Sequence, residues 1–308
     1  MTQQADIERA AAVLKAGGLV AFPTETVYGL GADATNPAAV ARVYAAKGRP
    51  QFNPLIAHVL DMAAAAAQAD MPDAARALAA QFWPGPLTLV LRRRETSTVS
   101  ELACAGLTTV ALRVPAHPTA RALLTAFGAP IVAPSANRSG RVSATTAAHV
   151  AADLDGAVDL VLDGGASPLG LESTIVAIDE AGRGTLLRPG AVARKQIESI
   201  IGSLRAPHGR TVSAPGMLES HYAPRARLRL DVINPGPNEA FLAFGAQAPE
   251  NGLTLSARGD LVEAAANLYA HLRALDATGA AVIAVAPIPA HGLGEAIRDR
   301  LARAAAPR

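Results

Sequence analysis

The chain has 308 residues, of which 50% are apolar, 18% charged and 4% aromatic. This composition excludes a disordered chain, which would be poor in apolar residues, and a collagen-like one, which would repeat Gly at every third position. The 28 basic and 26 acidic residues leave a net charge of +2, so charge alone does not indicate a nucleic-acid-binding protein. The single cysteine, Cys104, excludes an internal disulfide and is typical of a reducing compartment. With no basic, apolar leader and no apolar run of ~18 residues, we expect a cytoplasmic protein without membrane contact.

Helix-like and strand-like patterns alternate along the first part of the chain. Apolar residues follow one helical face at 6–15, and Gly17 and Gly18 end this helix before an apolar run at 19–22. We expect further helices near residues 37–46, 72–82, 118–127 and 144–152, and strands at 55–59, 87–91, 109–114, 131–133, 160–162, 173–178 and 185–187. This alternation predicts an α/β domain over residues 1–205, with a mixed, twisted sheet flanked by helices.

A linker and a second, smaller domain follow. Residues 206–226 contain Pro207, Gly209, Pro215, Gly216 and Pro224 and few apolar residues, so we expect a linker, and its length exceeds that of ordinary loops. Strands are expected at 227–232, 241–244, 253–255 and 280–285, and helices at 260–274 and 293–304. This pattern predicts a small Rossmann-like α/β domain over residues 227–308.

Polar segments follow several predicted strands. The segment from Phe22 to Gly31 reads Phe-Pro-Thr-Glu-Thr-Val-Tyr-Gly-Leu-Gly and includes Thr24 and Thr26. Loops at strand ends carry ligands in α/β proteins, but polar turns are also common. A binding loop and an ordinary turn, with Thr24 capping backbone amides, both stay open.

A cationic segment follows the helix expected at 37–46. Lys47 and Arg49 either stabilise the end of the helix dipole or supply the donors of a phosphate clamp. His58 ends the next strand, where a histidine is more often a core residue than a catalyst. Arg113 interrupts an apolar strand, and a buried guanidinium needs an anion. It therefore either reaches solvent or meets a carboxylate, from the protein or from a ligand.

Three further segments complete the set. The run from Ser135 to Gly140 precedes a helix that we expect to begin at Ser143, which would place backbone N–H groups beside an anion. Glu172 and Arg188 flank two later strands and are either site residues or a cap and a surface charge. Loops rich in Thr, Lys, Arg, Asn and Ser, without an obvious nucleophile–base pair, indicate a site that binds and positions a polyanion.

Six motifs occur in a fixed order. They are P-T-E-T-V-Y-G-L-G, K-G-R-P-x-x-N-P-L, W-P-G-P-L-T, A-P-S-A-N-x-S-G, E-S-T-I-V and L-R-P-G. Because these motifs occur in this order, the chain resembles the YrdC-like family of threonylcarbamoyl-AMP synthases over residues 6–205. The linker sequence Ser-His-Tyr-Ala-Pro at 220–224 and the region beyond it are similar to the long, two-domain form of that family.

The resemblance implies a nucleotidyltransferase that makes an intermediate for N6-threonylcarbamoyladenosine at position 37 of tRNA. L-threonine, bicarbonate or CO2, and ATP would give threonylcarbamoyl adenylate, pyrophosphate and water. The family pattern assigns the threonine pocket to Thr26, His58, Arg113 and Thr174. It assigns ATP binding to Arg49, Asn53, Thr109, Ser135, Ser143, Arg188 and Tyr222, and the catalytic signature to Lys47, Arg49, Ser135 and Asn137.

The resemblance also implies a cofactor and partners. Mg2+ would bridge phosphate oxygens with few protein ligands. The linker would act as a lid, with Tyr222 reaching the nucleotide, and would exclude water from the labile intermediate. The product would pass to the tRNA threonylcarbamoyl transferase complex. Weak RNA binding is an alternative role for the short basic run Arg92-Arg93-Arg94, although a solvated strand end explains this run more simply.

Overall fold

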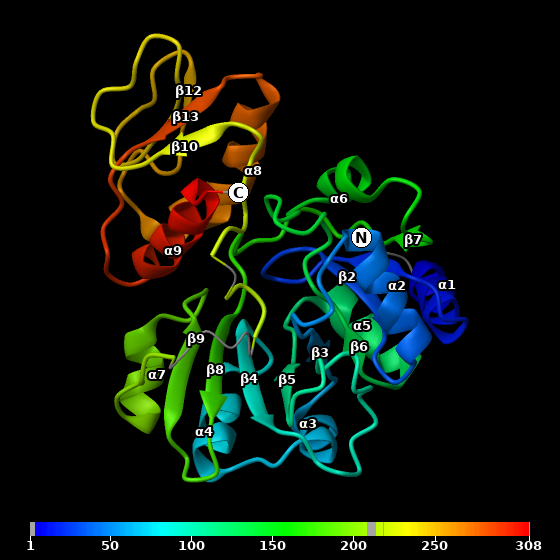
Figure 1. Cartoon of the computed structure of the whole chain (residues 1–308). Coiled ribbons are helices and arrows are strands. Elements are labelled where there is room, and N and C mark those ends of the chain that lie inside the picture. Colours follow the sequence, from blue (N-terminus) through cyan, green and yellow to red (C-terminus); the bar gives the residue numbers. More distant parts are fainter. Residues whose placement is uncertain (1–3, 208–213, 218, 308) are drawn as a thin grey trace.

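The computed structural model of the protein describes residues 4–207, 214–217 and 219–307. Within these ranges two separate sheets are formed, one in each part of the chain (Figure 1). The strands of the larger sheet are β1 (Val20–Phe22), β2 (Gly29–Asp33), β3 (Ile56–His58), β4 (Leu87–Arg92), β5 (Thr109–Arg113), β6 (Ile131–Val132), β7 (Leu160–Val161), β8 (Thr174–Ile178) and β9 (Gly184–Arg188).

The larger sheet has the order β7-β1-β2-β6-β3-β5-β4-β8-β9. It is mixed, because β1/β7, β3/β5 and β4/β8 pair in parallel and the other neighbours pair antiparallel. This arrangement confirms the predicted mixed α/β fold. It also brings the ends of β3, β5 and β9 and the start of β8 to the same end of their strands. The loops after β1 and β6 lie beside the start of β3.

Helices cover this sheet (Figure 1). They are α1 (Gln4–Lys15), α2 (Pro37–Lys47), α3 (Met62–Gln68), α4 (Asp73–Phe82), α5 (Pro118–Phe127), α6 (Ala147–Leu154) and α7 (Arg194–Ile201). The bounds of α2 have local causes. The side chain of Asn36 accepts hydrogen bonds from the first turn, and Gly48 takes the left-handed conformation, with φ 59°, that ends the helix. The helix therefore places Lys47 at its last position.

Three elements were not predicted, and one boundary was wrong. Strand β2 has the sequence Gly-Leu-Gly-Ala-Asp, which lacks the β-branched and aromatic residues typical of strands. A Cβ at Gly31 would lie 2.7 Å from the Phe22 ring, so this glycine allows β2 to lie close to that side chain. The alanine-rich α3 and the polar α7 also lacked a clear prediction. Helix α6 begins at Ala147 rather than at Ser143, because Thr146 accepts the capping hydrogen bond from the amide of His149.

The C-terminal part is a small, parallel α/β layer, as predicted. Its elements are β10 (Arg227–Arg229), β11 (Ala240–Ala243), β12 (Gly252–Thr254), β13 (Val282–Val285), α8 (Leu261–Ala277) and α9 (Gly294–Ala305). The sheet order is β10-β13-β11-β12, and all neighbouring strands run in parallel.

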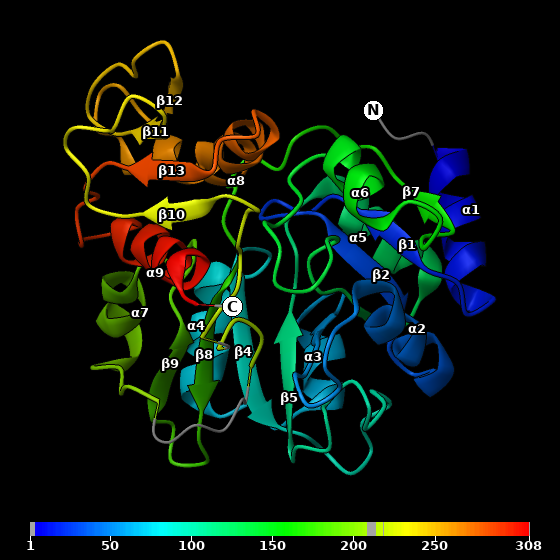
Figure 2. The same cartoon turned by 45° about the horizontal axis from the view of Figure 1, so that its top comes forward.

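The C-terminal layer packs directly on the larger sheet domain. One apolar cluster joins Val27, Val142 and Leu171 of the first part to Leu268 and Leu272 of α8. Figure 2 shows α9 lying beside α7 and β9 at the edge of the large sheet. The two parts therefore share a buried interface immediately beside the strand ends that carry the predicted site.

Candidate functional site

The converging loops enclose a small cavity at the edge of the large sheet. The predicted site residues that line it are Thr26, Arg49, His58, Arg113, Ser135, Arg188 and Tyr222. Its volume is about 40 Å³, whereas sites for small organic ligands usually measure roughly 300–1,000 Å³. Pro215, Gly216, His221 and Tyr222 form part of the wall. These linker residues therefore narrow the cavity to less than the usual size of a ligand site.

The buried charges of the protein gather around this cavity. Among the described residues, the charged side chains that are buried are five cations and two carboxylates: Lys47, Arg49, Arg113, Arg188, Arg300, Glu25 and Glu172. Buried charges are costly unless an opposite charge compensates them. The site consequently holds three more buried cations than buried carboxylates, which suits a polyanionic ligand.

Three of these cations contact only neutral oxygen atoms among the described residues. The Lys47 ammonium donates to the backbone carbonyls of Ser135 and Asn137. Arg49 donates to the carbonyls of Asn53 (3.3 Å) and Pro54 (3.0 Å). Burial lowers the pKa of Lys47, and it lowers that of Arg49 to about 10. An anion bound beside them would favour their charged forms.

Arg188 is the third cation without a carboxylate at bonding distance. Its Nη2 donates to the carbonyl (2.9 Å) and the hydroxyl (3.1 Å) of Ser173. Burial lowers the pKa of Arg188. The side chain is 4% exposed, so the expectation of a surface charge at this position is wrong.

Arg113 differs because it meets a carboxylate of the protein. Its Nη2 donates to Glu25 at 2.5 Å and its Nη1 donates to the Thr26 hydroxyl at 2.9 Å. Burial is the largest influence on the pKa of Glu25 and raises it, but the Arg113 charge and the hydrogen bonds from Arg113 and from backbone amides together lower this pKa below its usual value. Together with the bond from Nε to the Gly85 carbonyl, these contacts use three of the five guanidinium N–H groups. Two N–H groups of Arg113 can therefore serve a second carboxylate.

Two histidines of the site are neutral at physiological pH. Burial, reinforced by the charge of Arg113, lowers the pKa of His58 to about 3. Burial and the charge of Arg49 do the same for His221. Neither ring therefore carries a positive charge near pH 7, and neither adds to the cationic surplus.

The remaining predicted residues do not line the cavity, and Lys47 is one of them. Asn53 and Asn137 adjoin Arg49 and Lys47 through the backbone contacts described above. The hydroxyl of Ser143 donates to Glu172 at 2.5 Å, and that of Thr174 donates to the carbonyl of Val192 at 2.7 Å. The structure does not bring every predicted residue to the wall.

Thr109 lies further away, at the opposite end of β5 from Arg113. Alternating residues of a strand face the same side, so Thr109 shares a sheet face with Ala111 and Arg113. On that face Ala111 packs in an apolar cluster that is joined by Ala214 and Met217 of the linker. Linker residues therefore cover both the cavity and the apolar surface next to it.

Buried polar atoms without partners also gather here. Among the described residues eleven such atoms occur, and seven of them belong to residues at or next to the cavity: Asn53 Nδ2 and Oδ1, His58 Nδ1, Asn137 Oδ1, His221 Nδ1, Tyr222 OH and Arg300 Nη2. Native proteins leave few buried polar groups unsatisfied. This local excess indicates a site whose hydrogen bonds are completed by a ligand.

The sequence gives no signal that singles out Glu25, whose carboxylate is the buried ion-pair partner of Arg113. Glu172, expected as a site residue or a cap, is the buried ion-pair partner of Arg300. The cap reading of Glu172 is wrong. The run from Ser135 to Gly140 does not begin a helix, because α6 starts only at Ala147. Ser135 therefore reaches the cavity from the loop after β6, without a helix dipole behind it.

Other expected features have simpler structural roles. In the basic run at 92–94, Arg92 pairs with Glu180, and Arg93 and Arg94 donate to the backbone carbonyls of Val99 and Ala66. The Arg92 and Arg94 side chains are nevertheless 63% and 49% exposed, so the run lies at a solvated strand end. Among the described residues no cluster of three or more His, Cys, Asp or Glu side chains suits a metal ion. In the same part of the chain, no helix combines the length and the apolar character needed to cross a bilayer.

Comparison with known proteins gives consistent similarities over almost the whole chain. Two family models match, one described as "Telomere recombination" over residues 12–190 and one as "Threonylcarbamoyl-AMP synthase, C-terminal domain" over residues 192–306. The threonylcarbamoyl-AMP synthase of Pyrococcus abyssi is 42% identical over 97% of this chain and 93% of its own. That of Bacillus subtilis is 40% identical over 99% and 94%.

A solved structure shares the complete fold. The crystal structure of P. abyssi Sua5 complexed with L-threonine superposes with a TM-score of 0.91 at 38% identity. The superposition covers 98% of this chain and 95% of that one. Both the large mixed sheet and the small C-terminal layer are therefore shared.

Proposed function

The chain belongs to the threonylcarbamoyl-AMP synthase family, and from this premise we propose that it joins L-threonine, bicarbonate or CO2, and ATP. The threonine amine captures CO2 as a carbamate, and with bicarbonate this step releases water. A carbamate oxygen then attacks the α-phosphorus of ATP, and the bond to the departing pyrophosphate breaks. The products are threonylcarbamoyl-AMP and pyrophosphate.

The surplus of buried cations is the observation that carries this proposal. Lys47, Arg49 and Arg188 have no carboxylate partner among the described residues, so the triphosphate would supply the missing negative charge. Donors that are already aligned stabilise the charge that develops on the phosphoryl oxygens without reorganising during the reaction. Ser135 and Asn137, whose carbonyls hold the Lys47 ammonium, would fix the direction in which this lysine points.

The Arg113 side of the cavity suits an amino acid. A guanidinium with two N–H groups left over can bind the threonine carboxylate in a bidentate manner. Thr26, 2.9 Å from Arg113, adds a hydroxyl that can recognise the hydroxyl of the substrate. The neutral ring of His58 would complete the pocket without attracting a second anion. The crystal structure of the P. abyssi relative with L-threonine supports this substrate.

We assign the linker the role of a lid. Tyr222 and His221 lie buried against the cavity, and a volume of about 40 Å³ leaves no room for ATP, so this lid is closed. Opening would admit the substrates, and closure would exclude water from a labile carbamate and a mixed anhydride. Residues 208–213 and 218 of the predicted linker lie outside the described part of the chain.

Mg2+ would arrive with the nucleotide. The two buried carboxylates of the site, Glu25 and Glu172, are both engaged by arginines, so the described residues fit a cation held mainly by phosphate oxygens and water. The ion would neutralise part of the triphosphate charge. The protein's own residues would orient the phosphates around it.

The product is an activated intermediate, so a transfer step must consume it. We propose that the tRNA threonylcarbamoyl transferase machinery is this partner, which places the enzyme in the cytoplasm. RNA binding by the chain itself has only the short basic run at 92–94 in its favour, and there Arg92 pairs with Glu180 while Arg93 and Arg94 donate to backbone carbonyls.

Pyrophosphate release by the purified chain tests the proposal. ATP, threonine, bicarbonate and Mg2+ are omitted one at a time, and the nucleotides are separated by chromatography. We expect release and a new adenylate peak only in the complete mixture. ATP hydrolysis that proceeds without threonine, or no ATP turnover at all, would refute the proposed reaction.

A further inference from the structure

A buried network links the C-terminal layer to the wall of the cavity. Glu172, just before β8, lines the cavity and is 5% exposed. Its Oε2 accepts hydrogen bonds from Arg300 Nε of α9 at 2.9 Å and from the Tyr269 hydroxyl of α8 at 2.7 Å. Its Oε1 accepts the Ser143 hydroxyl at 2.5 Å. Two C-terminal helices therefore hold a carboxylate that belongs to the wall of the first domain's site.

Tyr269 and Arg300 also contact the ring of Tyr222. This ring stacks on Tyr269, with centroids 5.9 Å apart and an interplanar angle of 24°, and the Arg300 guanidinium lies 5.0 Å from its centroid. Tyr222 has a φ of 62°, which is unfavourable for an aromatic residue and persists only where the surroundings impose it. The C-terminal helices thus contribute to holding the linker in its closed position.

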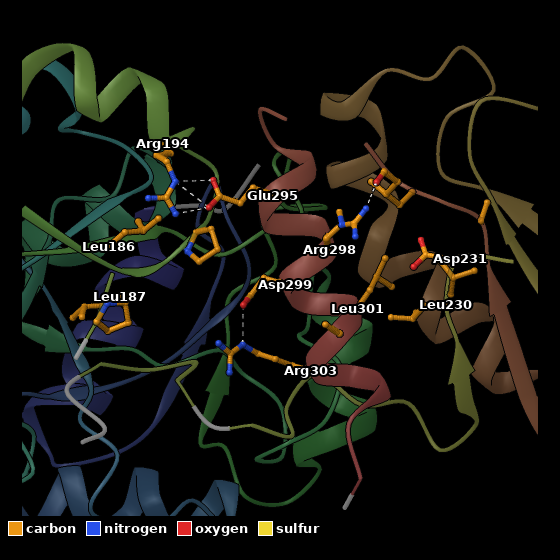
Figure 3. A pocket seen from close by; sticks show the side chains of 16 residues that line it. Leu186, Leu187, Arg194, Leu230, Asp231, Glu295, Arg298, Asp299, Leu301 and Arg303 are labelled. Carbon is orange, nitrogen blue, oxygen red and sulfur yellow. Dashed lines mark hydrogen bonds and ion pairs between the residues drawn. The ribbon is translucent and has the colours of Figure 1, made fainter. Parts of the chain in front are cut away.

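The burial of Arg300 exceeds what adhesion between two domains needs. Its side chain is fully buried, and Asp299 accepts a second bond from its Nη1 at 2.6 Å. The interface already has an apolar cluster and a half-exposed ion pair between Arg194 and Glu295 (Figure 3). A fully buried ion pair adds little net stability compared with apolar packing, so adhesion between the domains does not account for this one. Because Arg300 lies behind the cavity wall and its partner Glu172 lines the cavity, this ion pair holds the Glu172 carboxylate in one orientation at the wall.

We infer that Arg300 and Tyr269 are positioning residues of the proposed ATP site, an inference that rests on the proposed function. Neither side chain lines the cavity. They act through two residues that do line it, because they orient the carboxylate of Glu172 and seat the ring of Tyr222. The C-terminal layer is accordingly part of the machinery that shapes the nucleotide site, rather than a separate module.

The charge balance supports the same reading. Burial is the largest influence on the pKa of Glu172 and raises it, but the charges of Arg300 and Arg188, with the hydrogen bonds from Ser143 and Arg300, together lower this pKa to about 2. Glu172 is therefore a hydrogen-bond acceptor at neutral pH, and Ser143 and Tyr269 must donate to it. Loss of Arg300 would leave Arg188 as the nearest cation able to compensate Glu172. Arg188 would then be drawn away from the phosphates it is proposed to bind.

Kinetics of pyrophosphate release and ATP titration calorimetry on the full chain test this inference. Tyr269→Phe keeps the ring stacked on Tyr222 and removes one hydrogen bond to a charged group, so we expect kcat/KM for ATP to fall about tenfold. Arg300→Met should lower it further. The KM for threonine should change by less than about twofold in both variants, because the Arg113 side of the cavity is untouched. Arg194→Gln breaks the half-exposed interdomain pair of Figure 3 and serves as the matched control, with unchanged kinetics expected.

The outcomes separate the inference from the proposed function. If Arg300→Met is poorly folded, Tyr269→Phe decides the question. If Tyr269→Phe and Arg300→Met behave like Arg194→Gln, or if they raise the KM for threonine as much as that for ATP, the positioning role is refuted. If the wild-type chain forms no threonylcarbamoyl-AMP, the proposed reaction fails. Weaker ATP binding by Tyr269→Phe in the calorimeter would in that case still support the positioning role.

Discussion

Arg113 and Arg188 line the same cavity, yet their partners differ. Arg113 meets the carboxylate of Glu25 at 2.5 Å, whereas Arg188 contacts only backbone and hydroxyl oxygens among the described residues. Lys47 and Arg49 resemble Arg188 in this respect. On the Arg113 side of the cavity a carboxylate of the protein thus compensates the buried cation, whereas on the Arg188 side the buried cations have no compensating carboxylate among the described residues.

This difference in charge compensation indicates which kind of ligand each side of the cavity binds. A compensated arginine can orient a single carboxylate at little cost in stability. Three uncompensated cations raise the electrostatic cost of the empty site and favour a ligand with several negative charges. We therefore expect substitutions on the two sides to have opposite profiles, with stability affected most on one side and catalysis most on the other.

The largest expected effect on stability comes from Arg113→Met. This substitution leaves Glu25 buried without its cation, and we expect the free energy of unfolding to fall by about 3–5 kcal/mol. Urea unfolding measures the change. The double variant Arg113→Met with Glu25→Gln removes both charges and should recover at least half of the loss. A double variant as unstable as the single one would contradict the assigned pair.

Lys47→Met tests the other side. This substitution leaves no buried carboxylate without its cation, so the free energy of unfolding should fall by less than in Arg113→Met. Removing an aligned cation should reduce the rate of pyrophosphate release by about 10²–10³-fold. Lys195→Met, at an exposed position of α7, is the matched control and should retain full activity. Activity that survives in Lys47→Met would remove this lysine from the phosphate site.

The pH dependence of stability reports on Glu172. Its pKa in the folded protein, about 2, is lower than the usual 4.5, so folding favours the ionised form. A depressed pKa contributes stability that is fully present above about pH 4.5 and is lost as the pH falls toward 2. A shift of this size corresponds to about 3 kcal/mol.

Glu172→Gln should lack this component. The difference in unfolding free energy between wild type and variant should therefore shrink between about pH 5 and pH 3. Glu8→Gln, on the exposed face of α1, provides the control, and its difference from wild type should stay constant. A constant difference for Glu172→Gln as well would show that the carboxylate is not held in its ionised form.

Ligand-induced stabilisation gives the smallest effect and the finest distinction between the two sides. ATP at a hundred times its dissociation constant should stabilise the fold by about 2.7 kcal/mol, which raises the melting temperature by several degrees. Lys47→Met should lose the shift caused by ATP and keep the one caused by threonine. Arg113→Met should do the reverse. Equal loss of both shifts in either variant would show that the two sides are not independent.

Local signals explain why much of the fold could be predicted. Asn36, Pro37 and Gly48 mark both ends of α2, and apolar runs between turn residues mark β3, β4 and β5. Strand β2 escaped prediction because its glycines serve close packing against Phe22, which only the fold reveals. The position of Lys47 and Arg49 directly after a helix was visible in the sequence. The sequence did not show that the side chains of Lys47 and Arg49 contact only neutral oxygen atoms among the described residues.

Contacts between distant segments set the limit of prediction. Glu172 and Arg300 are 128 positions apart, and nothing in the sequence around Arg300 distinguishes it from the other arginines of the chain. Their pairing depends on how the C-terminal layer packs against β8. The boundaries of the domains at 205 and 227, and the roles of the site residues, stay predictions.

A crystal structure with threonine and a non-hydrolysable ATP analogue tests the central claim most directly. We predict that phosphate oxygens lie within hydrogen-bond distance of Lys47, Arg49 and Arg188, and that the threonine carboxylate lies on Arg113. The linker residues that now close the cavity would be displaced from it or would cover the nucleotide. Phosphates bound elsewhere, such as in the pocket between α9 and β9 that Figure 3 shows, with the three cations still on neutral oxygens, would contradict this prediction.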